Sequence, residues 1–283
     1  MTKVFVVDDE SQRQQKEAAK TFFAEVDKAI FRKTRVAFDC EGVDLSRVGS
    51  LEIVSLCFED ESSPNSAKAV YLLDLGGSGA SDQREERVAA LKKLFECKNV
   101  VKVIHDCRID CDALYHKWGI DLQNAHDTSC YHSLISGTES NLNDTLAYHG
   151  LSTNAARDNN VYKANPAFWA TRPLTLRMKT WASRDVAKLL PLATKQISVL
   201  SEAQKQKAAT LSSNATRFLV DMNLERGLRC MVSIGLFIGR KGCNLKSLER
   251  RTGTRITNRS QDEWLVYYQN RHSLLQVKQA MGY

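Results

Sequence analysis

Two acidic residues, one position apart, end an apolar segment near residue 40. Residues 36–38 (VAF) lead directly into Asp39, Cys40 and Glu41. Alternate residues of a β-strand point to the same face, so a strand here would project both carboxylates together. Carboxylates this close repel each other unless a cation neutralises them, and Mg²⁺ and Mn²⁺ prefer such oxygen ligands. An acidic pair is common at strand ends, so it indicates a metal site only when further acids join it.

Two later segments can supply those acids. Residues 102–112 (KVIHDCRIDCD) follow an apolar run and open a helix, and they offer Asp106, Asp110 and Asp112. Residues 181–190 place Asp185 on a long helix whose apolar residues continue beyond it. An acid in that setting is either solvated or collected into a site. The order of the three acidic segments favours a shared site.

The C-terminal part of the chain carries a different chemistry. Residues 217–283 hold 12 Lys+Arg against 5 Asp+Glu, whereas residues 1–216 hold 28 of each, so the C-terminal part carries the whole net charge of +7. Basic charge gathered in one small region is typical of a polyanion binder, and a merely solvated basic face is the alternative. Within it, two glycines enclose Arg240 and Lys241, an arrangement that lets backbone amides and cations approach phosphates.

The elements that must position these residues alternate between strand and helix. Apolar runs predict strands at 4–7, 36–39, 51–58, 70–75 and 100–104, and helical spacing predicts helices at 18–30 and 82–95. The strands between residues 36 and 75 follow one another closely, which indicates an antiparallel meander. From residue 109 to 200 the pattern is almost wholly helical. This order predicts an α/β fold in which helices pack on a mixed sheet.

A chain of 283 residues is longer than one typical domain. Residues 201–216 are polar and small, which suits a linker or an exposed helix. We therefore expect one domain over 1–200 and a second over 217–283. The second should be a small α+β domain, with strands at 228–233, 254–258 and 264–269, helices after the glycine pair, and a last helix at 273–281.

With its motifs in this order, the chain resembles the DEDD superfamily of 3'-5' exonucleases, in the RNase D-like branch with a ribonuclease H-like fold. The resemblance covers residues 1–200. It rests on DCEG at 39–42, KVIHDCRID at 102–110, NAHDTSCYHSL around Asp127, RPL at 172–174 and ASRDVAKLLPL at 182–192. It implies that the chain is an enzyme that hydrolyses phosphodiester bonds from the 3' end and releases nucleoside 5'-monophosphates.

The resemblance also implies one set of catalytic, metal-binding residues: Asp39, Glu41, Asp110 and Asp185. They would hold two Mg²⁺ or Mn²⁺ ions on the scissile phosphate. Asp39 would bridge both ions, Glu41 and Asp185 would complete the site of the ion that activates water, and Asp110 would serve the other. The last aspartate of the family's HDxxxD pattern is the ligand, which selects Asp110 over the other two aspartates of its segment.

The chain departs from the family pattern beside Asp185. Active relatives place a tyrosine four residues before this aspartate, or a histidine five before it, whereas this chain has Trp181 and Thr180. An indole N–H only donates a hydrogen bond, and a threonine hydroxyl is no base near neutral pH. In HDCRID at 105–110 and RPL at 172–174, the chain resembles the branch that contains Egalitarian and the exonuclease 3'-5' domain-containing proteins, and this branch includes RNA adaptors. The alternative function is therefore a weak or inactive exonuclease fold that serves as an RNA-binding adaptor.

Residues 238–256 resemble the core of a type I KH domain, with an IGRKG loop, a helix, a Thr-Gly terminator and a strand. The resemblance implies six nucleic-acid-binding residues: Ile238, Gly239, Arg240, Lys241, Gly242 and Lys246. The partner would be single-stranded RNA. Single-stranded DNA, and with it a DNA-processing exonuclease, is the alternative. We expect Trp264, Tyr267 and Tyr268 to be packing residues rather than base-stacking platforms.

The remaining features concern the environment of the chain. Its eight cysteines lack the paired spacing of a zinc ribbon, so we expect reduced thiols, although Cys107 and Cys111 at i,i+4 could share a metal or oxidise. No apolar run reaches about 18 residues, and the first nine residues are too short and too acidic for a signal peptide. We expect an intracellular protein, cytoplasmic or nuclear, without a membrane partner.

Overall fold

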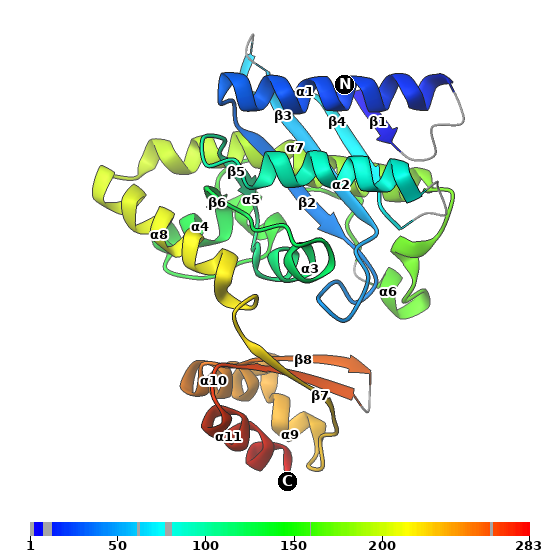
Figure 1. Cartoon of the computed structure of the whole chain (residues 1–283). Coiled ribbons are helices and arrows are strands. Elements are labelled where there is room, and N and C mark those ends of the chain that lie inside the picture. Colours follow the sequence, from blue (N-terminus) through cyan, green and yellow to red (C-terminus); the bar gives the residue numbers. More distant parts are fainter. Residues whose placement is uncertain (1–2, 8–12, 61–62, 77–80, 159, 261–262) are drawn as a thin grey trace. The chain divides into compact units, whose positions relative to one another are not determined.

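The computed structural model describes residues 3–7, 13–60, 63–76, 81–158, 160–260 and 263–283, which belong to two compact units, Met1–Arg217 and Phe218–Tyr283 (Figure 1). The described strands of the first unit form one sheet in the order β1-β4-β3-β2-β5-β6. They are β1 (Lys3–Val7), β2 (Val36–Glu41), β3 (Ile53–Asp60), β4 (Ser63–Asp74), β5 (Lys102–Ile104) and β6 (Ala125–Asp127). The run β2-β3-β4 is antiparallel, and the other pairs are parallel. The predicted mixed sheet and its meander are confirmed.

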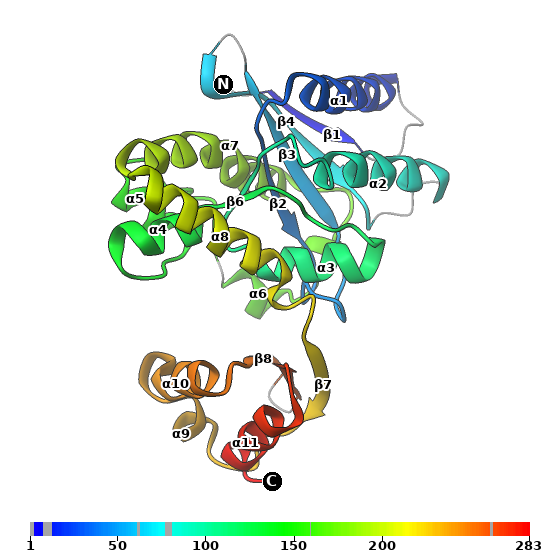
Figure 2. The ribbon, with the colours of Figure 1, turned by 60° about the vertical axis from the view of Figure 1, so that its left-hand side comes forward.

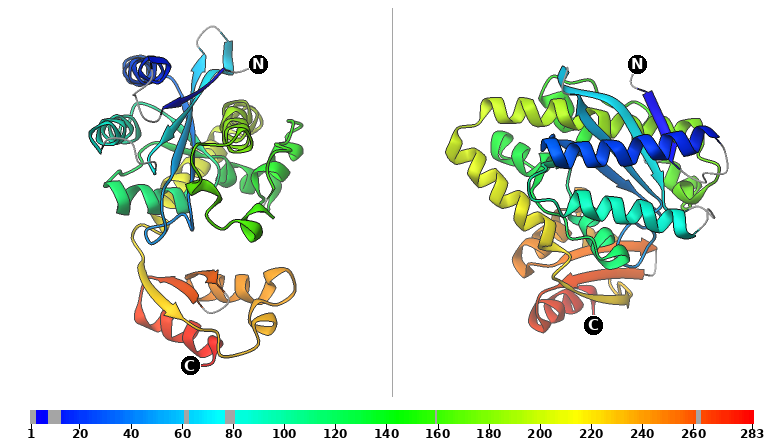
Figure 3. Two further views of the ribbon diagram at one scale, coloured as in Figure 1. Left: turned by 90° about the vertical axis from the view of Figure 1, so that its right-hand side faces the viewer. Right: turned by 45° about the horizontal axis from the view of Figure 1, so that its top comes forward.

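Helices cover both faces of this sheet (Figure 3). α1 (Arg13–Arg32) and α2 (Ser81–Phe95) lie on one face, and α7 (Leu176–Val199) lies across the other. α1 turns Ala18, Phe22 and Val26 toward the core, at the spacing that one helix face requires. The other helices are α3 (Arg108–Trp118), α4 (Thr128–Ser136), α5 (Leu142–Tyr148), α6 (Val161–Ala164), the 3₁₀ turn η1 (Phe168–Ala170) and α8 (Glu202–Phe218).

α8 occupies the segment that we predicted to be a linker or an exposed helix. It lies beside α4 and α7 in the first unit (Figure 2). Its small residues Ala208 and Ser212 are buried, and Ala208 packs in a cluster with Tyr131 and Leu200. The Ser212 hydroxyl also accepts a 3.1 Å hydrogen bond from the Asp127 amide. The segment is thus a packed helix, while the division of the chain into two functional domains stays a prediction.

The second unit has the element order of the predicted α+β domain. It contains β7 (Asn223–Leu228), α9 (Ile234–Ile238), the 3₁₀ turn η2 (Arg240–Gly242), α10 (Cys243–Thr252), β8 (Arg255–Ser260), β9 (Glu263–Tyr268) and α11 (Arg271–Met281). The antiparallel sheet has the order β7-β9-β8. Trp264 and Tyr267 are 1% and 0% exposed, which confirms them as packing residues, and Tyr268 packs against the same core while it is only partly buried.

One predicted strand was misplaced, and one strand was missed. We placed a strand at 228–233, but β7 ends at Leu228, because the Met231 amide bonds to the Met281 carbonyl (2.8 Å) beyond the sheet. β6, at Ala125–Asp127, falls in a region that we read as helical, because three residues are too few for a periodic signal.

The two remaining expectations concern the state of the cysteines and the presence of membrane-spanning helices. All eight cysteines, including Cys107 and Cys111, are free thiols, as predicted. Over the described ranges, no helix combines the length and the apolar character that crossing a bilayer requires.

Candidate active site

Three predicted carboxylates meet where α7 crosses β2. Asp39 and Glu41 alternate with buried Cys40 on β2, so they leave the strand on the same face. α7 packs on that face and buries Asp185 completely. Oxygen atoms of Asp39, Glu41 and Asp185 lie within 4.8 Å of one another. Such a set of hard oxygen ligands fits a divalent cation.

Asp110 stands beside this group rather than within it. It lies in the first turn of α3, is 6% exposed, and its Oδ1 accepts a 3.0 Å hydrogen bond from the Cys40 amide. That bond fixes the Asp110 carboxylate against β2, one residue from both Asp39 and Glu41. The negative charge of Asp110 contributes to a raised pKa of Asp39, after the larger effect of burial. All four predicted carboxylates therefore belong to one electrostatic neighbourhood.

The other two aspartates of the 102–112 segment are engaged elsewhere. Asp106 accepts a 2.6 Å bond from Arg108. Asp112 accepts bonds of 2.7 Å from both the Arg47 backbone amide and the Arg47 guanidinium. Each carboxylate is thus paired with an arginine. The choice of Asp110 over these two aspartates as a metal ligand stays a prediction.

Burial raises the pKa of every carboxylate in the acidic group. Burial, followed by the charges of neighbouring acids, raises the pKa of Asp39 and of Glu41 well above their ordinary values. Burial raises the pKa of Asp110 to about 7, against the lowering effect of its hydrogen bonds. Burial also raises the pKa of Asp185. A bound divalent cation would favour the charged carboxylates and so oppose this effect of burial.

Two residues that the sequence did not indicate complete the surroundings of Asp185. Both come from the irregular segment between α5 and α6. The Asn154 side-chain amide donates to Asp185 Oδ1 (2.9 Å) and to the Trp181 carbonyl (3.0 Å). Arg157 Nη1 donates to Asp185 Oδ2 at 3.1 Å. A lone asparagine and a lone arginine in a segment without periodicity give no signal that could have found them.

Trp181 fills an aromatic cluster next to Asp185. The indole is 1% exposed, and its ring centroid lies 5.6 Å from that of Trp169 and 6.0 Å from those of Tyr162 and Phe168. Its Nε1 makes no hydrogen bond of ordinary geometry, yet the indole N–H helps to lower the pKa of Asp185. The indole thus lies beside the carboxylates, and it offers them a donor but no proton acceptor.

The basic loop of the second unit has a backbone that requires its glycines. Gly239 and Gly242 have φ of 73° and 77°, and a Cβ on Gly239 would lie 2.6 Å from Asn244 Cγ. Lys241 also takes a positive φ of 53°. The predicted cations Arg240, Lys241 and Lys246 are exposed, while Ile238 packs partly against the core. The loop therefore presents cations and close-approach backbone to solvent, as a phosphate-binding loop requires.

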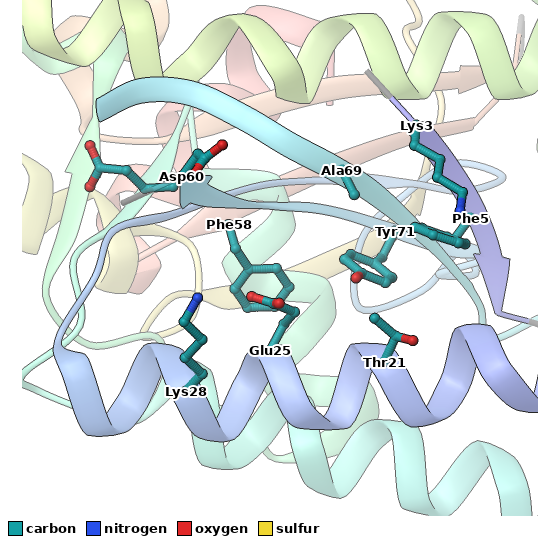
Figure 4. Close-up of a pocket in the computed structure, with 10 residues that line it drawn as sticks. Lys3, Phe5, Thr21, Glu25, Lys28, Phe58, Asp60, Ala69 and Tyr71 are labelled. Carbon is teal, nitrogen blue, oxygen red and sulfur yellow. The ribbon is translucent and has the colours of Figure 1, made fainter. Parts of the chain in front are cut away.

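A separate pocket lies under α1, on the opposite face of the sheet from α7 (Figure 4). Its volume is about 270 Å³, and its walls include Phe58 and Tyr71 from the sheet and Glu25 and Lys28 from α1. It contains none of the four predicted carboxylates. The pocket under α1 is therefore not part of the acidic site.

Residues 13–200 match the family model of the 3'-5' exonuclease domain, and residues 231–271 match that of the KH domain. The piRNA biogenesis protein EXD1 of Mus musculus is 33% identical over 140 residues, which cover 44% of this chain and 23% of that protein. The chain thus spans about a quarter of the length of this curated relative.

Two solved structures from Trypanosoma brucei have a similar fold. RNase D superposes with a TM-score of 0.58 at 21% identity, covering 76% of this chain and 72% of its own. The catalytic core of RRP6 gives a TM-score of 0.57 at 19% identity, covering 76% of this chain and 52% of its own. These similarities confirm the predicted RNase D-like fold.

Proposed function

This chain belongs to the 3'-5' exonuclease family, and we propose that it is a metal-dependent exonuclease that shortens single-stranded RNA from the 3' end. The observation that carries the proposal is the convergence of Asp39, Glu41 and Asp185 within 4.8 Å. A buried acidic group of this kind has no evident structural use, because its members repel one another. A bound divalent cation would neutralise this repulsion, and a metal-dependent nuclease uses such a cation in its reaction.

In the proposed site, Asp39, Glu41 and Asp185 would hold one ion, and Asp39 and Asp110 would hold a second. Two Mg²⁺ or Mn²⁺ ions bound there would activate water and stabilise the attacking and leaving oxygens. The water oxygen would lose a proton and attack the phosphorus of the terminal nucleotide, and the bond from that phosphorus to the preceding 3' oxygen would break as this oxygen takes up a proton. The products are a nucleoside 5'-monophosphate and a chain with a new 3' hydroxyl. The Cys40 amide would keep the Asp110 carboxylate in place throughout.

RNA is the substrate class that the second unit favours. Its KH domain presents Arg240 and Lys241 from a loop whose glycines permit close approach to phosphates. KH loops of this type clamp about four nucleotides of a single strand. The curated relative is named for piRNA biogenesis, which agrees with RNA as the ligand. In this proposal the KH domain binds the RNA strand, and the acidic site removes its 3' nucleotides.

The second candidate function is an RNA-binding adaptor with little or no nuclease activity. The observation that favours it is Trp181, because a buried indole beside Asp185 cannot take a proton from water. Loss of general-base assistance costs on the order of 10²–10⁴ in rate. That range extends from a slow enzyme to an inactive fold, so activity has to be measured.

The test is degradation of a 5'-labelled single-stranded RNA by the full chain, with Mg²⁺ or Mn²⁺ and with EDTA. The Asp39→Ala, Glu41→Ala double variant removes two carboxylates of the site. The matched control is Glu17→Ala with Asp27→Ala, which removes two exposed carboxylates of α1. We expect stepwise, metal-dependent 3' shortening by the wild type and the control, and none by the site variant. RNA that stays intact but bound would instead support the adaptor.

A further inference from the structure

Protein donors already engage both oxygens of the Asp185 carboxylate. Asn154 bonds to Oδ1 at 2.9 Å, and the Arg157 guanidinium bonds to Oδ2 at 3.1 Å. Asn154 is neutral, so it orients the carboxylate without changing the charge of the site. Arg157 adds a full positive charge where a metal ion would supply one. The two partners of Asp185 therefore have different consequences for cation binding.

The charge of Arg157 acts on the whole acidic group. Its guanidinium lowers the pKa of Asp39, of Glu41 and of Asp185, opposing the larger effect of burial on each. The same three carboxylates hold the pKa of Arg157 above its ordinary value. Arg157 thus contacts Asp185 directly, and Asp185 is one of the three residues whose oxygens converge within 4.8 Å.

The chain around Arg157 is fixed, while its side chain keeps access to solvent. The backbone N–H of Asn154 donates a hydrogen bond to Asn143 Oδ1 at 2.8 Å, and the Asp158 side chain pairs with Arg177 at 2.9 Å. The chain is thus anchored on both sides of Arg157. The Arg157 side chain is 36% exposed, whereas Asp185 is fully buried. A long side chain at the edge of the site can turn outward without unfolding the segment that carries it.

We propose that Arg157 is a built-in counter-cation that occupies the acidic site of the metal-free protein and is released from Asp185 when a divalent ion binds. This inference rests on the proposed function, because it assumes that Asp39, Glu41 and Asp185 bind the metal. A guanidinium and a divalent ion repel each other across a shared carboxylate, so they compete for it. The guanidinium keeps the empty site folded, and it lowers the affinity of the site for metal.

The test is a titration of the full chain with Mn²⁺, in which electron paramagnetic resonance reports the free ion. Arg157→Gln removes the competing charge, so we expect Mn²⁺ to bind about 10-fold more tightly, the size of effect that groups around a metal site commonly have. Arg157→Lys keeps the charge and should bind Mn²⁺ like the wild type. Arg184→Gln is the control, because it removes the same charge from an exposed position beside Asp185 on α7.

Thermal unfolding provides a readout that a purely structural arginine would not change in this way. Arg157→Gln should lower the melting temperature in EDTA, where the acids lose their counter-ion, and Mn²⁺ should restore it. If Arg157→Gln lowers the melting temperature equally in EDTA and in Mn²⁺, and leaves the affinity for Mn²⁺ unchanged, the inference is overturned while the proposed metal site stands. A third outcome is that neither the wild type nor Arg157→Gln binds Mn²⁺ at a site that requires Asp39 and Glu41. This outcome would overturn the proposed metal site together with the inference.

Discussion

Asn154 and Asp185 form a buried pair in which the asparagine amide donates a 2.9 Å hydrogen bond to the carboxylate. Asn154 is 1% exposed and Asp185 is 0% exposed. The same amide group bonds to the Trp181 carbonyl, one turn earlier on α7, and the Asn154 oxygen accepts from the Ala156 amide. Asn154 therefore fixes the direction of a carboxylate that the exonuclease motif alone leaves undetermined.

We expect Asn154→Ala to reduce both stability and activity. It leaves a buried carboxylate oxygen and the Ala156 amide without their partner, at a cost of about 1–3 kcal/mol in the free energy of unfolding. Urea unfolding measures that cost, and Asn214→Ala, at an exposed position on α8, is the control. Because Asp185 would lose its orientation, RNA shortening should slow even where the variant is fully folded. Unchanged activity in a destabilised variant would reduce Asn154 to a structural residue.

Asp39→Asn should separate stability from function. Burial and the charges of Asp110 and Asp185 raise the pKa of Asp39, so a neutral side chain of the same shape relieves repulsion in the metal-free protein. We expect a higher melting temperature in EDTA than that of the wild type. Nuclease activity should fall, on the order of 10²–10³-fold, because an electrostatic group of the reaction is lost. A drop in melting temperature would contradict the electrostatic account of the site.

Asp110 gives the metal-free protein a defined pH dependence. Burial raises its pKa from 3.8 to about 7, so the folded chain holds a proton that the unfolded chain releases between these values. The stability from this proton is fully present below pH 3.8 and is lost as the pH rises through 7. Within the window, the free energy of unfolding in EDTA should fall as the pH rises, by roughly 1 kcal/mol per pH unit.

Asp110→Asn removes this contribution, because the amide does not titrate. It also removes the effect of the Asp110 charge on the pKa of Asp39 and of Glu41, while groups outside the acidic group keep their own pH dependence. The difference between wild type and variant should therefore slope downward with rising pH and level off above 7. A difference that does not change between pH 5 and pH 8 would show that Asp110 is ionised in the folded protein at pH 5.

Much of the site could be predicted because its geometry follows from local periodicity. The side-chain alternation of β2 places Asp39 and Glu41 on one face, and the long apolar helix α7 carries Asp185 to that face. Asn154 and Arg157 could not be predicted, because irregular chain brings them to Asp185 across 31 and 28 residues. Contacts of that kind depend on tertiary packing, which leaves no repeat in the sequence.

The fold shows the same division between local and tertiary signals. The apolar runs of β2 and β3 identify strands directly, whereas β6 has only three residues. α8 hides its packing face, because its buried positions include small residues such as Ala208 and Ser212 rather than large apolar ones. The apolar segment after β7 misled the strand prediction, since Met231 is 67% exposed.

The loop of the KH domain should contribute phosphate contacts without base specificity. Arg240→Gln combined with Lys241→Asn removes both cations, and asparagine tolerates the positive φ of residue 241. We expect weaker binding of single-stranded RNA, and a salt dependence reduced by about 0.7 in log–log slope for each lost contact. Fluorescence anisotropy at several salt concentrations measures both. Arg250→Gln with Arg251→Gln, on exposed positions of α10, is the charge-matched control. An equal slope for both double variants would mean that net charge alone binds the RNA.

Trp181→Tyr addresses the choice between exonuclease and adaptor. The ring would remain among Trp169, Phe168 and Tyr162, while the hydroxyl would bring to the side of Asp185 a group that can accept a hydrogen bond. If water orientation limits the reaction, RNA shortening should accelerate by on the order of 10²-fold. The smaller ring should cost about 0.5–3 kcal/mol of stability.

Trp181→Phe is the matched control, because it reduces the ring in a similar way without adding a hydroxyl. If the tyrosine variant shortens RNA faster and the phenylalanine variant does not, the indole is the cause of slow catalysis at an otherwise competent acidic site. Equal rates for both variants, with RNA binding retained, would mean that Trp181 is not what limits the nuclease. In that case, the Arg157→Gln variant tests the remaining obstacle, since Arg157 engages the same Asp185 carboxylate from the opposite oxygen to Asn154.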